Sequence, residues 1–183
     1  MLHLSREQML AMWKRLLHFE TPRRDCVVER DDGLDLDAWL MTIIDTWYAH
    51  TLATAPVEWL PVEDLRDHVT LTLLSDGAVD VALPVQAVRP VEWKLDGWKC
   101  PVSEFAAPDS VTAALQANPF TRGGACRPVV VDHGDRLTLF SAPDAPAPPR
   151  LSTARCVVRP ADGTFIIHQE ALSTIRLPEI EMP

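Results

Sequence analysis

The sequence predicts an α+β protein in which two N-terminal helices pack on an antiparallel β-meander, with a short additional helix. Up to residue 55 the apolar residues recur at intervals of three and four, which is the helical period. After Pro61 the period shortens to two, and β-branched runs alternate with turn signals such as Asp-Gly. These two patterns, one after the other, favour a helical part followed by a sheet part.

Chain length sets the expected number of domains. The 183 residues suffice for one well-buried core and are few for two, so we expect a single domain over residues 1–183. Within it, residues 1–56 should be helical and residues 57–176 β-rich, and residues 177–183 should form a frayed tail.

Two amphipathic helices should open the chain. The first spans residues 5–18, and Ser5 can accept hydrogen bonds from the free N–H groups at its start. The second spans residues 36–52 and should end before Pro56. Because a sheet of this length needs one face covered, we expect the two apolar stripes to cover it. The residues expected in that seam are Trp13, Leu16, Leu17, Leu40, Ile44 and Trp47.

Short strands joined by tight turns should form the β-rich part. Asp76-Gly77 lies between two alternating runs and predicts a β-hairpin, and Asp96-Gly97 predicts another turn. The proline-dense residues 142–150 lack sheet donors and should form an extended surface loop. The expected strands are 69–74, 78–83, 85–94, 98–102, 128–132, 136–140 and 152–158; a short helix is expected at 110–117, and residues 164–175 are ambiguous with a helical centre.

Charge and hydropathy disfavour two classes of partner. The formal net charge of -9 would repel the phosphates of nucleic acid, so generic nucleic-acid binding is not expected. The most apolar run, residues 38–55, is interrupted by Asp45 and His50, so we expect no membrane span. Charged residues also break the apolar pattern of the first twenty positions, which argues against a signal peptide and for a cytoplasmic protein.

The cysteines give no sign of a metal site or a disulfide framework. They are far apart in the sequence, and none belongs to a C-x-x-C pair or to a zinc-ligand spacing. We therefore expect reduced and mostly buried thiols. The four are Cys26, Cys100, Cys126 and Cys156.

An acidic run before the second helix invites comparison with a calcium loop. Gly33 precedes the alternating pair Asp35 and Asp37 instead of lying midway, and no glutamate follows at the required spacing. We interpret the run, which begins with Asp31 and Asp32, as a solvated loop that caps a helix. No metal and no cofactor are expected.

Catalytic residues have little support in the sequence. A histidine beside an aspartate could act as a general base, but no serine or cysteine lies in a nucleophile motif. Gly123-Gly124 is not followed by the residues of a phosphate-binding loop. The histidines weighed are His68, His133 and His168, with Asp67, Asp132 and Asp135 near them in the sequence.

Six tryptophans against one tyrosine is the most unusual feature of the composition. Trp13, Trp39 and Trp47 lie on helical stripes and should be buried. The others lie near predicted turns, where an exposed indole is a common anchor for a protein partner. The interface candidates are Trp59, Trp93 and Trp98.

Several short segments resemble a group of small phage and prophage structural proteins of head–tail connector or ring type, from Bacteroidales viruses. The similar segments are residues 36–40, 55–56, 81–84, 96–102, 116–120, 127–129 and 137–140. After Leu83-Pro84 the sequence reads Val85-Gln86, where this group would have an acidic-aromatic pair. The resemblance implies no catalytic residues. It implies assembly into a symmetric, multi-copy ring, and a location in the bacterial host cytoplasm and the virion.

The leading functional hypothesis is therefore a non-catalytic structural or assembly subunit that contacts other protein subunits, other copies of itself included. One alternative is a small hydrolase-like enzyme whose His, Cys and Asp residues meet only in space, in a pocket that holds His133 or His168. Another is a regulatory module that binds a small ligand between the helices and the sheet.

Overall fold

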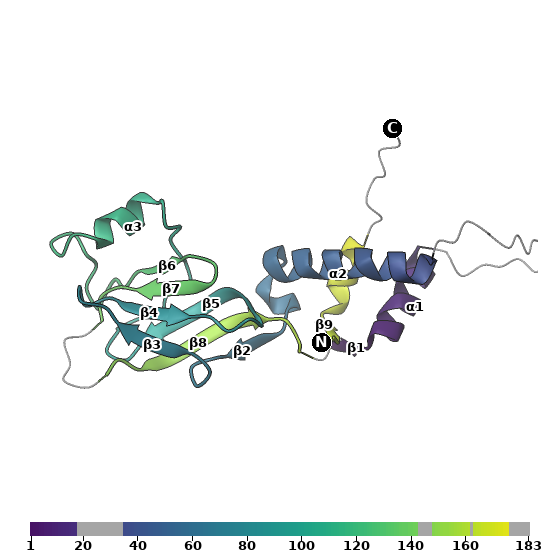
Figure 1. Ribbon diagram of the computed structural model, residues 1–183, viewed down its shortest axis with the longest axis horizontal. Helices are drawn as coiled ribbons and strands as arrows, with labels where there is room; N and C mark the ends of the chain where they lie inside the picture. Colours follow the sequence, from purple (N-terminus) through teal and green to yellow (C-terminus); the bar gives the residue numbers. More distant parts are fainter. Residues whose placement is uncertain (18–34, 143–147, 162, 176–183) are drawn as a thin grey trace, which may run out of the picture. The chain divides into compact units, whose positions relative to one another are not determined.

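A computed structural model describes residues 1–17, 35–142, 148–161 and 163–175. The chain forms two compact units, which we call the helical unit (Met1–Pro61 with Pro160–Pro183) and the sheet unit (Val62–Arg159). Helices at the N-terminus and antiparallel sheets confirm the α+β class (Figure 1). Residues 160–175, which we assigned to the β-rich part, belong to the helical unit; the single domain itself stays a prediction.

The helix starts are those that the capping residues predict. Helix α1 (Arg6–Leu16) begins at Ser5, whose side chain accepts from the N–H of Gln8 at 3.2 Å while the Ser5 N–H donates to Gln8 Oε1 at 2.9 Å. Helix α2 (Leu36–Thr54) begins at Asp35, whose carboxylate accepts from two backbone N–H groups at 3.0 Å. No described helix is long and apolar enough to cross a membrane.

The helical unit also contains a strand pair that the sequence did not reveal. Strand β1 (Leu2–Leu4) pairs antiparallel with β9 (Phe165–Ile167), so the two ends of the described chain meet. The 3₁₀ helices η1 (Val57–Trp59) and η2 (Gln169–Thr174) complete the unit.

Aromatic contacts close the core of the helical unit. The rings of Trp13 and Trp47 meet edge to face with centroids 5.5 Å apart, and Tyr48 meets Phe165 at 5.0 Å. The Tyr48 hydroxyl donates to the carbonyl of Ile166 at 3.1 Å and accepts from its N–H. The contacts described for the helical stripes thus come from α1, α2 and β9 of their own unit.

The stripe residues are buried to different degrees, and Leu17 and Trp47 are only partly buried. Trp13, Leu40 and Ile44 are fully buried, as the helical period predicts. Leu16 is 46% exposed, so its predicted burial is wrong. It is the last residue of α1.

Two antiparallel sheets form the sheet unit. One has the order β2-β8-β5 and the other β3-β4-β7-β6, so β2–β8, β5–β8 and β4–β7 pair strands that are not consecutive. The expected hairpin is β3–β4, with Gly77 at φ +79° in its turn. The strands are β2 (Val62–Asp64), β3 (Thr70–Leu73), β4 (Val79–Ala82), β5 (Ala87–Leu95), β6 (Val130–Asp132), β7 (Arg136–Leu139) and β8 (Leu151–Val158).

Residues from both sheets share one core. Val79, Val81 and Leu139 of the four-stranded sheet belong to the same buried cluster as Trp93 and Ala154 of the three-stranded sheet. The sheet unit therefore buries the inner faces of its two sheets together. The segment 98–102, expected as a strand, makes only the isolated bridge between Trp93 and Val102.

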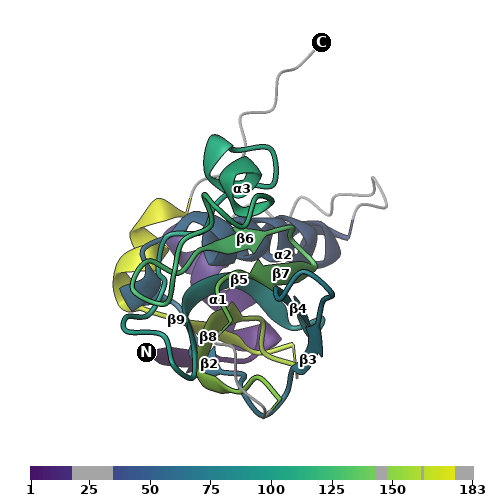
Figure 2. The ribbon, with the colours of Figure 1, turned by 90° about the vertical axis from the view of Figure 1, so that its left-hand side faces the viewer.

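One helix stands apart from these sheets. Helix α3 (Val111–Gln116) lies between β5 and β6 in the chain and is capped by Ser110, as predicted. In Figures 1 and 2 it lies beyond β6, on the side away from β2 and β8. We call residues 110–123, the helix with the turn that follows it, the α3 arm.

Candidate functional site

The structure corrects two of the three tryptophan candidates. Trp93 is 0% exposed and Trp98 is 3% exposed, so the expectation that they stand at an exposed edge is wrong. Gly97, at φ +89°, reverses the chain, and the bridge to Val102 folds the next segment back beside β5. This return turns both indoles into the core. The Trp98 indole N–H donates to the carbonyl of Ser141 at 2.8 Å.

Trp59 is partly buried and lines an apolar groove in the helical unit. The groove has a volume of about 330 Å³. It lies at the end of α2, where the Trp47 indole N–H donates to Thr174 Oγ1 at 3.3 Å. The N–H of His168 donates to the carbonyl of Trp59 at 2.9 Å and fixes η1 beside η2. The groove is also lined by His50, Thr51, Thr54, Ala55, Pro56 and Ala171.

Three of the exposed large apolar side chains of the sheet unit lie on the α3 arm. Val111 is 77% exposed, Leu115 is 46% exposed and Phe120 is 98% exposed. Val111 and Leu115 are four residues apart and so lie on one face of α3. We call these three residues the α3 patch. The sequence pattern does not reveal this patch, although Phe120 belongs to the segment 116–120 that carries the resemblance.

Hydrogen bonds hold the turn of the α3 arm in one conformation. The N–H of Phe120 donates to Asn118 Oδ1 at 3.0 Å. Thr121 Oγ1 donates to the carbonyl of Leu115 at 2.6 Å, which closes the end of α3. The buried Gln116 side chain accepts from the Gly123 N–H at 3.1 Å. Phe120 is therefore presented on an ordered turn.

Arg122 fastens the arm to the β3–β4 hairpin. Its guanidinium donates to the carbonyl of Asp76 at 2.6 Å, to the Asp76 carboxylate at 3.0 Å and to the carbonyl of Gln116 at 2.8 Å. It also lies 5.2 Å from the centroid of the Phe140 ring. The N–H of Ala78 and the Arg122 guanidinium lower the pKa of Asp76 below its ordinary value.

A larger cavity lies under the arm, with a volume of about 610 Å³. Both Cys100 and Cys126 line it and both are exposed, so their predicted burial is wrong. Glu104 and Arg127 supply one charge of each sign to its wall. Cys156 is buried, as expected, and burial raises the pKa of its thiol to about 12. Cys26 lies outside the described residues.

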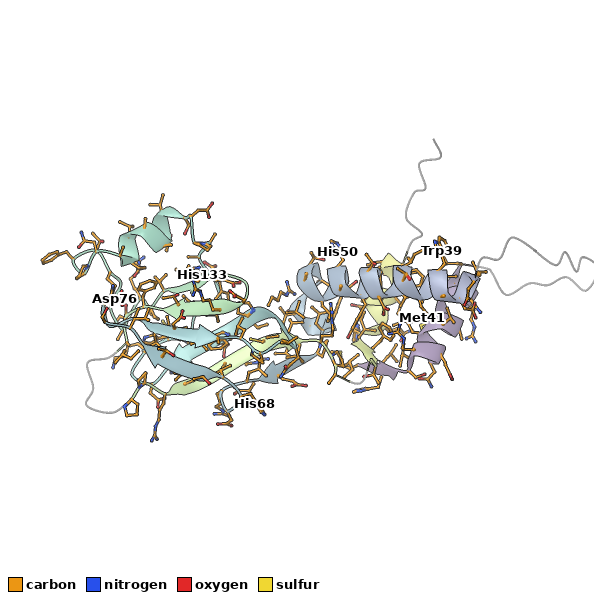
Figure 3. All side chains as sticks on the ribbon, in the orientation of Figure 1. Trp39, Met41, His50, His68, Asp76 and His133 are labelled. Atoms are coloured by element: carbon orange, nitrogen blue, oxygen red, sulfur yellow. The ribbon has the colours of Figure 1, made fainter. Side chains whose placement is uncertain are left out.

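Two of the three histidines weighed for catalysis, His133 and His168, make local side-chain hydrogen bonds. His68 and His133 lie on opposite sides of the sheet unit (Figure 3). The His133 ring hydrogen-bonds Thr138 Oγ1 at 3.1 Å, and His168 caps η2 by accepting from the Glu170 N–H at 3.3 Å. Neither His133 nor His168 lines the apolar groove or the cysteine cavity.

Metal binding gains no support from the described residues. Within residues 1–17, 35–142, 148–161 and 163–175, no three His, Cys, Asp or Glu side chains lie together as metal ligands would. Asp35 caps α2, as predicted. Asp31, Asp32 and Gly33 of the acidic run lie outside the described residues.

Compared with known proteins, the chain matches no protein-family model and no curated protein.

Proposed function

We propose that the protein is a non-catalytic assembly subunit that binds other protein subunits through the α3 patch. The observation that carries this proposal is the exposure of Val111, Leu115 and Phe120 on one short arm. Exposed apolar side chains that gather in one place, on a soluble domain, are typical of surfaces that bind protein.

The rigidity of the arm supports the same function. Binding costs less when the contacting side chains are ordered beforehand. Arg122 and Gln116 fix the arm through side-chain hydrogen bonds, so Phe120 does not have to be ordered by the partner. An exposed aromatic side chain on an ordered backbone is a common anchor at a protein interface.

We propose a second copy of this chain as the partner. The resemblance to phage connector and ring proteins implies a multi-copy assembly, and a ring forms when one surface of each copy binds a different surface of the next. The Trp59 groove, apolar and partly exposed, is the second surface we propose for such a contact. Trp59 thus stays an interface candidate.

The test compares how substitutions in the α3 patch and at an equally exposed residue outside it affect the formation of oligomers. Val85 is 103% exposed on the turn between β4 and β5 and lies outside the patch. In native mass spectrometry we expect concentration-dependent oligomers of the wild type, their loss in the double variant Val111→Ser/Phe120→Ser, and their retention in Val85→Ser. A wild type that is monomeric at every concentration and binds no co-encoded protein would overturn the proposal.

A further inference from the structure

Two exposed cysteines, Cys100 and Cys126, line the cavity under the α3 arm and lie close together. The N–H of Lys99 donates to the carbonyl of Ala125 at 2.9 Å, and each cysteine is the next residue along its segment. The Cys100 thiol lies 3.7 Å from the carbonyl oxygen of Cys126. Residues 26 positions apart in the sequence are therefore neighbours in space.

Their backbone spacing suits a disulfide. A disulfide requires Cα atoms about 4.4–6.8 Å apart. The hydrogen bond between Lys99 and Ala125 holds the two segments together, and strands bonded in this way in a sheet lie about 4.7–4.9 Å apart, a spacing inside that range. The segment that carries Cys126 is also a tight turn, in which the Arg127 N–H donates to the Gly124 carbonyl at 2.8 Å. A Cβ at Gly123 would collide with the carbonyl of Arg127, so the turn requires glycine there.

We infer that Cys100 and Cys126 are a redox-active dithiol that closes to a disulfide by exchange with a low-molecular-weight disulfide such as oxidised glutathione. This inference does not depend on the proposed function. The thiolate of one cysteine attacks a glutathione sulfur and releases one glutathione thiolate. The second cysteine, as thiolate, then attacks the protein sulfur of the mixed disulfide and releases the other glutathione. Two protein thiols are oxidised, one glutathione disulfide is reduced to two glutathione thiols, and the two protein protons pass to the released thiolates.

The surroundings distinguish this pair from the remaining described cysteine. Both thiols open onto a cavity of about 610 Å³, which gives a small disulfide access to them. The Arg127 side chain at the wall attracts an anionic tripeptide, and Glu104 on the same wall opposes it. Cys156 lies in the core between the sheets, where it has neither access nor an exposed partner thiol.

Closure would tie the base of the α3 arm to the sheet unit. The bond would complete a covalent ring from residue 100 to residue 126 that contains the whole arm, and so it would restrict the arm and narrow the cavity beneath it.

The experiment treats the full chain with oxidised glutathione, blocks remaining thiols with N-ethylmaleimide and maps tryptic peptides without reduction. Trypsin cleaves after Lys99 and Arg122, so Cys100 and Cys126 fall in different peptides. We expect these peptides to be joined in the wild type, with the loss of two hydrogen atoms, and Cys26 and Cys156 to end up outside that cross-link.

The variants separate the two exchange steps. In Cys100→Ser, the Cys126–glutathione adduct should accumulate, because the thiol that resolves it is gone; in the wild type that adduct should be absent at the end of the reaction. Cys156→Ser should cross-link as the wild type does. Stable glutathione adducts on both Cys100 and Cys126 in the wild type, or a cross-link from either to Cys26, would overturn the inference.

Discussion

The apolar residues of the two cores and those of the α3 patch have similar chemistry and opposite environments. Phe165 is 2% exposed and meets Tyr48, whereas Phe120 is 98% exposed at the tip of an ordered turn. Leu40 is fully buried, whereas Leu115 is almost half exposed. A buried apolar side chain contributes to the free energy of folding, and an exposed one is available to a partner. The contrast teaches that the apolar side chains of the two cores and those of the α3 patch lie on separate elements.

The largest expected effect comes from a charge in the core of the helical unit. Ile44→Asp should lower the free energy of unfolding by at least about 4 kcal/mol, because it removes a fully buried side chain and leaves a carboxylate without a described partner. Circular dichroism should show the loss of the α1 and α2 signal. Ile44→Val is the matched control and should cost only about 1 kcal/mol. Retention of the wild-type helical signal by Ile44→Asp would show that the site is not core.

The next largest loss of stability is expected on substitution of Trp98, and it is the opposite of what the position of Trp98 in the sequence predicts. Beside the Asp96-Gly97 turn we would expect Trp98→Ala to spare the fold and weaken assembly. Because the side chain is buried, the substitution should instead cost about 3–5 kcal/mol. Trp98→Phe keeps most of the volume but leaves the Ser141 carbonyl without the indole N–H, and should cost about 1–3 kcal/mol. Denaturant unfolding of both variants should show a larger loss in the free energy of unfolding for Trp98→Ala than for Trp98→Phe.

Asp76→Asn should have a smaller effect that depends on pH. It removes the ion pair with Arg122, and we expect a loss of about 1 kcal/mol at neutral pH. The pKa of Asp76 is lowered in the folded protein, so the carboxylate stabilises the fold above its unfolded pKa. That contribution is lost as the pH falls through the lowered folded pKa. The difference in melting temperature between wild type and Asp76→Asn should therefore shrink in acid. A difference that grows in acid would contradict the lowered pKa of Asp76 in the folded protein.

Local signals predicted most of the elements, and long-range pairings could not be predicted. Ser5 and Asp35 mark helix starts and Gly77 marks a hairpin because each acts on residues within a few positions. The β5–β8 and β1–β9 pairs join distant segments, and nothing in either segment specifies its partner. For the same reason, the proximity of Cys100 and Cys126 does not show in the sequence.

The wrong prediction that Trp93 is exposed has a more specific cause. In β5 the buried residues are Trp93 and Leu95, an alternation that indicates an inward-facing side. Pro90 and the register shifts of this strand obscure that alternation in the sequence. The exposure of the α3 patch, in turn, depends on the arm standing off β6, which a six-residue helix does not reveal by its own pattern.

The smallest expected effect on stability is that of substituting Phe120. Comparing it with the same substitution at the buried Phe165 tests directly whether the α3 patch differs from the core. Phe165→Ala removes a buried ring from the contact with Tyr48 and should cost about 3–5 kcal/mol. Phe120→Ala removes a ring that is 98% exposed, so the free energy of unfolding should change by no more than about 0.5 kcal/mol. Both should be measured by denaturant unfolding at a dilution where the wild type is monomeric, so that loss of a partner does not contribute. If Phe120→Ala destabilises the monomer as strongly as Phe165→Ala does, the ring packs within its own chain and the α3 patch loses its central residue. If the monomer is unchanged while oligomers are lost at higher concentration, the same side chain is dispensable for folding and required for contact.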